Sequence, residues 1–173
     1  MSRKPPDDDF VDFYNARARR LRTTAYLLCG DWHLSQDLCS QVFLKLYRAW
    51  PRIERHGPVD AYAHRVLLRT FLDERRRPWR REVPAAEVPP SARPIEAPGD
   101  DRVLLRGGLA ALPPRQRAVL VLRFFVDLSV EQTAAALDCS PGTVKIQTSD
   151  ALANLRRRLG DALDDLRPVR KAL

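Results

Sequence analysis

A run of side chains near the C-terminal end has the types and spacing needed to contact the edges of DNA bases. On a helix of about 3.6 residues per turn, one side would carry the following residues: Thr143, Ile146, Gln147, Ser149, Asp150, Ala153, Asn154 and Arg157. A glutamine amide can pair with an adenine edge, and an isoleucine can pack on a thymine methyl group. A carboxylate such as that of Asp150 opposes tight binding, because phosphate repels it unless it accepts a hydrogen bond from a cytosine amine. The alternative is a solvated helix that only completes a bundle.

Two short helices joined by a turn are expected to position these residues. Ser129 and Gln132 have the spacing of a capping box, and Ser140 followed by Pro141 predicts the start of a second helix. The side of this second helix that would face the core holds Val144, Thr148, Ala151, Leu152, Leu155 and Leu159. Two capped helices joined by about four residues indicate a helix-turn-helix, whose second helix usually enters the DNA major groove.

A helix predicted from 37 to about 50 carries one leucine on its polar side. Its apolar side would hold Cys39, Val42, Phe43, Leu46 and Trp50. Its polar side would hold Asp37, Ser40, Gln41, Lys45 and Arg48, with Leu44 among them. An isolated exposed leucine is ordinary on a protein surface, but the same arrangement also suits a surface on which another helix docks.

The next predicted helix, from 60 to 77, is basic on its outer side. Ala63, Leu67, Thr70 and Phe71 mark the inner side, and Tyr62, Arg65, Arg69 and Arg76 the outer side. Residues 65–81 contain seven arginines and two acids, Asp73 and Glu74. Basic groups with an aromatic among them suit a single nucleic-acid strand, whose bases stack and whose phosphates need neutralising. The alternative is a basic face that is merely solvated.

Composition favours an anionic partner and a location inside the cell. The 173-residue chain has a formal net charge of +8, and 26 of its 30 basic residues are arginine, since only four are lysine. Arginine binds phosphate with two parallel hydrogen bonds, although a GC-rich coding sequence would give the same bias. The chain lacks both an apolar run of about 18 residues and a signal-peptide core, so we expect a protein that is not inserted in a membrane.

The sequence offers little for catalysis. Cys29, Cys39 and Cys139 form an odd set without metal-ligand spacing, and we expect buried thiols rather than a zinc site with His33. No glycine-rich phosphate loop, nucleophile elbow or acid–base pair is evident. The expectation is a protein without cofactor, metal or catalytic residue.

The helical pattern divides into two parts, which predicts an all-α fold of two small domains. Residues 1–9 are expected to be disordered, 10–77 to form the first domain and 101–166 the second, and 167–173 a tail. The first pattern is broken near Gly30-Asp31, at Pro51 and at His56-Gly57-Pro58. Six prolines in 78–100 predict an extended linker. The segment Ala118-Val-Leu-Val-Leu could form a buried strand, but the preceding Pro113-Pro114 favours a helix.

These features, in this order, resemble bacterial RNA polymerase sigma factors of the extracytoplasmic-function type, in the sigma-70 superfamily. The resemblance covers nearly the whole chain, from about 10 to 166. It depends on three segments: Gln36-Asp-Leu-Cys-Ser-Gln-Val-Phe-Leu-Lys-Leu-Tyr-Arg, Leu112-Pro-Pro-Arg-Gln-Arg-Ala-Val-Leu-Val-Leu-Arg and Ser140-Pro-Gly-Thr-Val-Lys.

The resemblance implies a cytoplasmic bacterial factor with three contact surfaces. Core RNA polymerase would bind, through its clamp, Asp37, Ser40, Gln41, Leu44 and Arg48. The minus-ten element, melted so that an unstacked base of the non-template strand is trapped, would meet Arg55, His56, Asp60, Tyr62, Arg65, Arg69 and Arg76. Duplex minus-thirty-five DNA would meet Ser140, Thr143, Lys145, Ile146, Gln147, Ser149, Asp150 and Arg157, while the second domain lies on the polymerase flap.

Several residues depart from the family pattern. The clamp-facing helix has Ser40 and Gln41 where glutamine and glutamate are common, the minus-ten helix has Arg69 where asparagine is frequent, and the second helix of the helix-turn-helix has Ile146 and Asp150. Promoter preference therefore cannot be transferred from other members.

Two other functions are compatible with parts of the chain. One is a helix-turn-helix regulator that acts without stable polymerase association, and the other is a DNA-processing enzyme such as a recombinase, for which Tyr62 and Ser35 lack a supporting constellation. An anti-sigma factor could also clamp two domains on a flexible hinge, but no residue identifies one.

Overall fold

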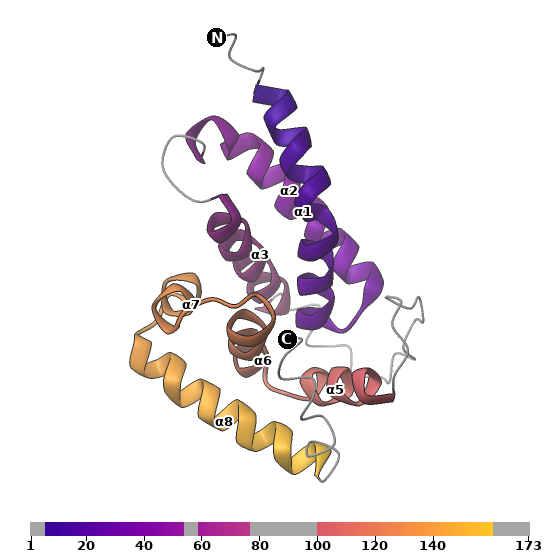
Figure 1. Ribbon diagram of the computed structural model, residues 1–173, viewed down its shortest axis with the longest axis vertical. Helices are drawn as coiled ribbons and strands as arrows, with labels where there is room; N and C mark the ends of the chain where they lie inside the picture. Colours follow the sequence, from indigo (N-terminus) through magenta and orange to yellow (C-terminus); the bar gives the residue numbers. More distant parts are fainter. Residues whose placement is uncertain (1–5, 54–58, 77–99, 161–173) are drawn as a thin grey trace. The chain divides into compact units, whose positions relative to one another are not determined.

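The computed structural model describes residues 6–53, 59–76 and 100–160, and these contain helices and no strand, as expected for an all-α protein (Figure 1). In chain order the helices are α1 Pro6–Cys29, α2 Trp32–Ile53, α3 Val59–Arg76, α5 Asp100–Ala110, α6 Pro114–Leu120, the π-helix η1 Val121–Phe125, α7 Val130–Leu137 and α8 Pro141–Leu159. Most of α1 with α2 and α3 forms one compact unit, and α5 to α8 belong to a second. The predicted linker and tail lie outside the described residues.

The first unit has its core where α2 packs along α3. Leu38, Val42 and Leu46 of α2 are buried, as are Leu67 and Phe71 of α3. The predicted inner sides of both helices are therefore confirmed, except that Phe43 is only half-buried.

Aromatic rings join α1 to α2 in this unit. Phe10 meets Tyr47 and Trp50 edge-on, with ring centroids 5.1 Å apart in both pairs, and Tyr14 meets Phe43 at 4.6 Å. Such edge-to-face pairs add to the stabilisation that burial of the rings provides. The helix α1 begins at Pro6, so 6–9, expected to be disordered, form its first turn.

The break at Gly30-Asp31 is confirmed and has a clear physical cause. Gly30 adopts a φ of +74°, which glycine tolerates at the end of a helix because it has no side chain. Asp31 then caps α2, since its Oδ1 accepts the N–H of Leu34 at 2.8 Å.

The predicted break at Pro51 is wrong, because α2 continues through Pro51 to Ile53. Proline has no backbone N–H and therefore removes one helical hydrogen bond. Because Pro51 lies in the last turn of α2, only two helical residues follow it. Ile53 beyond it is buried, so packing holds the final turn in place. The break at His56-Gly57-Pro58 lies outside the described residues.

The second unit closes around a leucine cluster formed by α5, α6 and α8. Leu109, Leu112, Leu120, Ala151 and Leu155 are its buried members. The buried Arg117 of α6 donates to the carbonyls of Ala110 and of Leu112, the latter at 3.1 Å. These bonds satisfy carbonyl groups that a helix end leaves without partners, so Arg117 fixes the turn from α5 into α6.

Residues 118–122 are helical, which confirms the interpretation drawn from Pro113-Pro114. Helix α6 begins with Pro113 as its N-cap and Pro114 within its first turn. It passes into the π-helix η1, where the N–H of Val126 donates to the Val121 carbonyl at 3.0 Å. The change from an α-helix to the wider π-helix was not predicted from the sequence.

The helix-turn-helix is present as α7 and α8. The Ser129 and Gln132 side chains form the predicted capping box, with distances of 3.0 and 2.8 Å. Helix α7 ends at Leu137, and the C-cap residue Asp138 has a left-handed φ of 54°. Ser140 caps α8 by accepting the N–H of Thr143 at 3.1 Å, and Pro141 is the first helical residue. Helix α8 ends at Leu159, and 161–166 lie outside the described residues.

Candidate nucleic-acid interface

The outward side of α8 is the surface that was predicted from the sequence to bind duplex DNA. Ile146 is 63% exposed, and Lys145, Ser149, Asp150 and Arg157 are exposed as well. Thr143 and Gln147 are half-buried at the edges of this side. The opposite side is anchored by the buried Val144, Ala151 and Leu155, while Thr148, Leu152 and Leu159 are half-buried. The large apolar side chain of Ile146 thus lies among polar groups, on a helix whose opposite side packs in the core.

Two hydroxyl groups that were predicted to contact DNA also form hydrogen bonds at the start of α8. Ser140 Oγ caps α8 and lies 2.9 Å from Thr143 Oγ1 in a second hydrogen bond. Each hydroxyl has one O–H donor and one of the two is used in this bond, so only one of them at a time can donate to a phosphate.

Arg157 is linked through Asn154 to α6. Asn154 Nδ2 donates to Gln116 Oε1 at 2.7 Å, and Asn154 Oδ1 accepts a hydrogen bond from Arg157 Nη2. The helical periodicity of the sequence predicted that Asn154 lies on the outward side. It could not indicate Gln116 as a partner, because Gln116 is 38 residues away in the chain.

Glu131, in the first turn of α7, lies close enough to act electrostatically on Lys145 and Arg123. Hydrogen bonding to its own N–H and to the Ser129 side chain lowers the pKa of Glu131, and the charges of Lys145 and Arg123 lower it further. Sequence reasoning missed this carboxylate beside a predicted DNA contact.

A second candidate surface lies on α2. Asp37, Ser40, Leu44 and Arg48 are exposed and Gln41 is half-buried, with Leu44 51% exposed. Lys45, which shares this side, instead reaches α3 and donates to Thr70 Oγ1 at 2.9 Å. Tyr47 is exposed beside this surface, although the sequence analysis did not include it.

The outer side of α3 presents the expected basic residues. Arg69 and Arg76 are exposed, and Tyr62 and Arg65 are half-buried. Arg55 and His56 lie outside the described residues. The helix therefore offers cations with an aromatic ring, which is the combination suited to a single strand.

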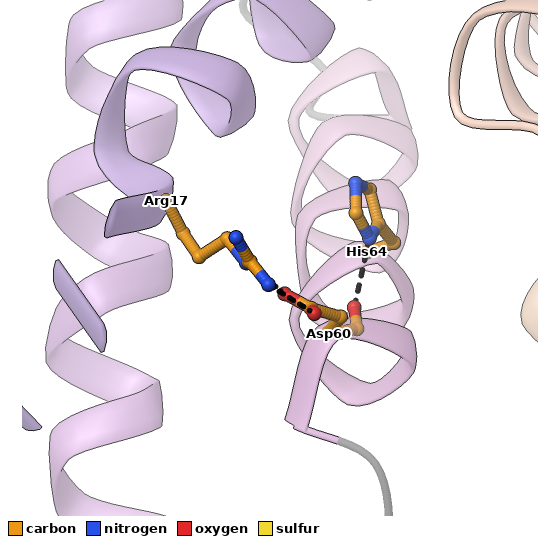
Figure 2. Close-up of polar contacts among 3 residues, drawn as sticks. All are labelled: Arg17, Asp60 and His64. Carbon is orange, nitrogen blue, oxygen red and sulfur yellow. Dashed lines mark hydrogen bonds and ion pairs between the residues drawn. The ribbon is translucent and has the colours of Figure 1, made fainter. Parts of the chain in front are cut away.

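Asp60 has a partner within the protein. Arg17 of α1 donates to both carboxylate oxygens of Asp60, from Nε at 2.7 Å and from Nη2 at 3.0 Å (Figure 2). Asp60 raises the pKa of Arg17 through this hydrogen bond and its charge. The carboxylate named as a minus-ten contact thus joins the start of α3 to α1, and a contact with DNA would have to share it with Arg17.

His64 lies one turn further along α3 and is 8% exposed. Its Nδ1 is 2.7 Å from the Asp60 carbonyl oxygen (Figure 2), so this nitrogen carries a proton. Burial lowers the pKa of His64, and the hydrogen bond to Asp60 partly opposes the shift. Among the described residues, Nε2 of His64 has no hydrogen-bond partner.

Metal ligation finds no support in the part of the chain that is described, where no group of three or more His, Cys, Asp and Glu could hold an ion. The three cysteines are thiols; Cys39 is buried, and Cys29 and Cys139 are half-buried rather than buried as expected. No helix within residues 6–53, 59–76 and 100–160 is long and apolar enough to cross a membrane.

Two family models match the chain. The Sigma-70 region 2 model matches residues 13–81, and the Sigma-70, region 4 model matches residues 102–155. The first match begins within α1 and includes α2 and α3, and the second extends from within α5 to most of α8.

Curated relatives and a solved structure show the same likeness. The RNA polymerase sigma-E factor of Streptomyces coelicolor is 38% identical over 154 residues, covering 87% of this chain and 86% of that protein. The ECF RNA polymerase sigma factor ShbA of Streptomyces griseus is 34% identical, covering 80% and 78%. The sigma factor RpoE of Bartonella quintana, solved in complex with the anti-sigma factor NepR, has a TM-score of 0.76 at 23% identity, covering 87% and 96%, which shows a common fold.

Proposed function

The chain belongs to the extracytoplasmic-function group of sigma-70 factors, and we propose how its surfaces divide the work of such a factor. It is an alternative sigma factor that directs RNA polymerase to promoters and initiates transcription. In our assignment α2 binds the polymerase clamp, α3 binds the melted minus-ten strand and α8 binds the minus-thirty-five duplex.

The observation that carries the clamp assignment is the exposed Leu44 on α2. A leucine that is 51% exposed between Asp37, Gln41 and Arg48 gives a small apolar centre with a polar rim, which is the usual anatomy of a protein interface. Core binding at this surface would use Asp37, Ser40, Gln41, Leu44 and Arg48.

The two DNA assignments depend on charge and exposure. On α3 the contacts are Tyr62, Arg65, Arg69 and Arg76, together with Arg55, His56 and Asp60. On α8 they are Ser140, Thr143, Lys145, Ile146, Gln147, Ser149, Asp150 and Arg157. Ile146 would select a thymine methyl group, and Gln147 an adenine edge.

All of this work consists of binding. We propose that the protein is not an enzyme, uses no cofactor or metal, and acts in the bacterial cytoplasm, where its polymerase is found. An anti-sigma factor is a further candidate partner, since the RpoE structure is a complex with one.

A crossed pair of substitutions tests the division of labour. Leu44→Asp should weaken binding to core polymerase by at least about tenfold, because the interface would bury an unpaired carboxylate. Ile146→Asp, which makes the same change at a similarly exposed leucine-sized side chain on α8, should leave core binding unchanged. Binding is measured with labelled protein and purified core enzyme, and circular dichroism confirms that both variants are folded.

The second arm uses the holoenzyme. Ile146→Asp should reduce transcription from a promoter with an intact minus-thirty-five element and have little effect when that element is scrambled. Unchanged core binding by Leu44→Asp would refute the clamp assignment. Tight, sequence-specific duplex binding by the free protein, without core association, would instead establish a helix-turn-helix regulator.

A further inference from the structure

Three polar side chains form a chain of hydrogen bonds from α6 to the outward side of α8. The Gln116 oxygen accepts from the Asn154 amide nitrogen at 2.7 Å, and the Asn154 oxygen accepts from Nη2 of Arg157. Gln116 and Asn154 are half-buried, whereas Arg157 is exposed. The chain therefore begins beside the leucine core and ends at the surface.

The chemistry of this chain fixes the orientation of each amide. An asparagine side chain has one oxygen that accepts and one nitrogen that donates. The guanidinium of Arg157 can only donate, so the Asn154 oxygen must face Arg157 and the Asn154 nitrogen must face α6. The Asn154 nitrogen is a donor, so Gln116 must present its oxygen to it.

Arg157 lies on the side of α8 opposite the core. On a helix of about 3.6 residues per turn, with the buried Val144 and Leu155 facing the core, the side chain of Arg157 points in the same direction as those of Ile146 and Asp150. A guanidinium has five N–H donors, so the bond to Asn154 leaves the others for an anion. An unsupported exposed arginine would lose considerable rotamer freedom on binding, and a side chain that is already held loses less.

We propose that Gln116 is a positioning residue for DNA binding, which through Asn154 holds Arg157 towards a phosphate of the minus-thirty-five duplex. The inference rests on the proposed function of α8 and adds a residue of α6 that does not itself reach DNA. Because phosphate contacts carry no sequence information, the chain of bonds should raise affinity without changing base preference.

The test measures the affinity of the complete holoenzyme for a promoter duplex over a series of potassium chloride concentrations, at low temperature where the duplex stays closed. The duplex is selected from random-sequence DNA by the wild-type holoenzyme. Loss of one phosphate contact reduces the slope of log affinity against log salt by about one, so Arg157→Ala should show that reduction.

Gln116→Met keeps the size of the side chain and removes the acceptor. It should weaken binding about two- to tenfold and lower the salt slope in the same direction. Gln116→Glu keeps an acceptor oxygen for Asn154 and should retain most of the wild-type slope. In the Arg157→Ala background, Gln116→Met should have no further effect, since residues that act through one another are not additive.

The outcomes separate the two claims. If Arg157→Ala leaves the slope unchanged, both the DNA role of Arg157 and the positioning role of Gln116 are refuted. If Arg157→Ala lowers the slope but Gln116→Met has no effect, or has an equal effect in both backgrounds, only the positioning role is refuted.

Discussion

At the scale of single residues, His64 shows how burial and charge combine at the start of α3. Its ring is buried, its Nδ1 donates to the Asp60 carbonyl, and the nearby Arg17 and Arg20 disfavour a second proton. Neutral imidazole is therefore the form that the fold accommodates. The exposed ion pair of Arg17 with Asp60, both about half exposed, adds little stability but brings α1 to the same point.

The lowered pKa of His64 predicts a pH dependence of stability. The unfolded chain binds the proton near pH 6.5, whereas the folded chain resists it until a lower pH. The contribution of neutral His64 to the free energy of unfolding is therefore fully present above about pH 6.5 and is lost as the pH falls below that value. Urea unfolding followed by tryptophan fluorescence, which reports the first unit through Trp32 and Trp50, should show the loss.

The matched variants are His64→Gln and His33→Gln. Since His33 is exposed, its replacement should leave the pH dependence as in the wild type, whereas His64→Gln should flatten it. The same pH dependence in all three proteins would contradict the assignment.

Exposure of individual residues was predictable, and their partners were not. The helical wheel identified Leu44 and Ile146 as outward apolar side chains, because that depends only on the residues of one helix. The pairs Arg17–Asp60 and Gln116–Asn154 depend on which side chains a second helix brings into reach. Spacing along one helix contains no such information, so neither the Arg17 partner of Asp60 nor the Gln116 partner of Asn154 was predicted.

At the scale of elements, adjacent glycines in α5 have different surroundings. A methyl group on Gly107 would have no heavy atom within 4 Å, whereas one on Gly108 would lie 2.7 Å from Leu155 Cδ1 and 3.2 Å from Leu159 Cδ2. Leu155 is buried in the leucine cluster and has little room to move. Close packing of α5 against α8 therefore requires glycine at 108 and not at 107.

These surroundings predict opposite effects of the same substitution. Gly107→Ala should stabilise the second unit by about 0.5–1 kcal/mol, because alanine is the better helix former. Gly108→Ala should destabilise it by about 1–3 kcal/mol through overpacking. Hydrogen exchange of the α8 amides measures both changes, and equal protection in the two variants would show that α5 does not pack on α8 in this way.

Local signals predicted the beginnings of α7 and α8, whereas α2, predicted from 37, begins at Trp32. The capping box of Ser129 and Gln132 and the Ser140-Pro141 start are each contained in a few consecutive residues, and all formed as expected. Helix α2 passed Pro51 because the burial of Ile53 outweighed a local breaking signal. The π-helix η1 carries no local signal that we recognise.

At the scale of the whole molecule, the proposed binding surfaces are divided between two helical units. In our account, α2 and α3 of the first unit and α8 of the second must engage polymerase and promoter together. The family assignment explains why a protein with a charge of +8 presents basic side chains on two separate helices. The proposed clamp contact would also account for the exposed Leu44, which a simple DNA-binding protein would not need.

A sigma factor of this family gives promoter selectivity to core RNA polymerase. The most direct test is transcription in vitro with purified core enzyme, the full chain and fragmented genomic DNA of the bacterium that encodes it, with sequencing of the RNA 5′ ends. We expect discrete start sites that need the chain, share upstream minus-ten and minus-thirty-five elements, and disappear with Leu44→Asp. Start sites that are the same with and without the chain would contradict this expectation.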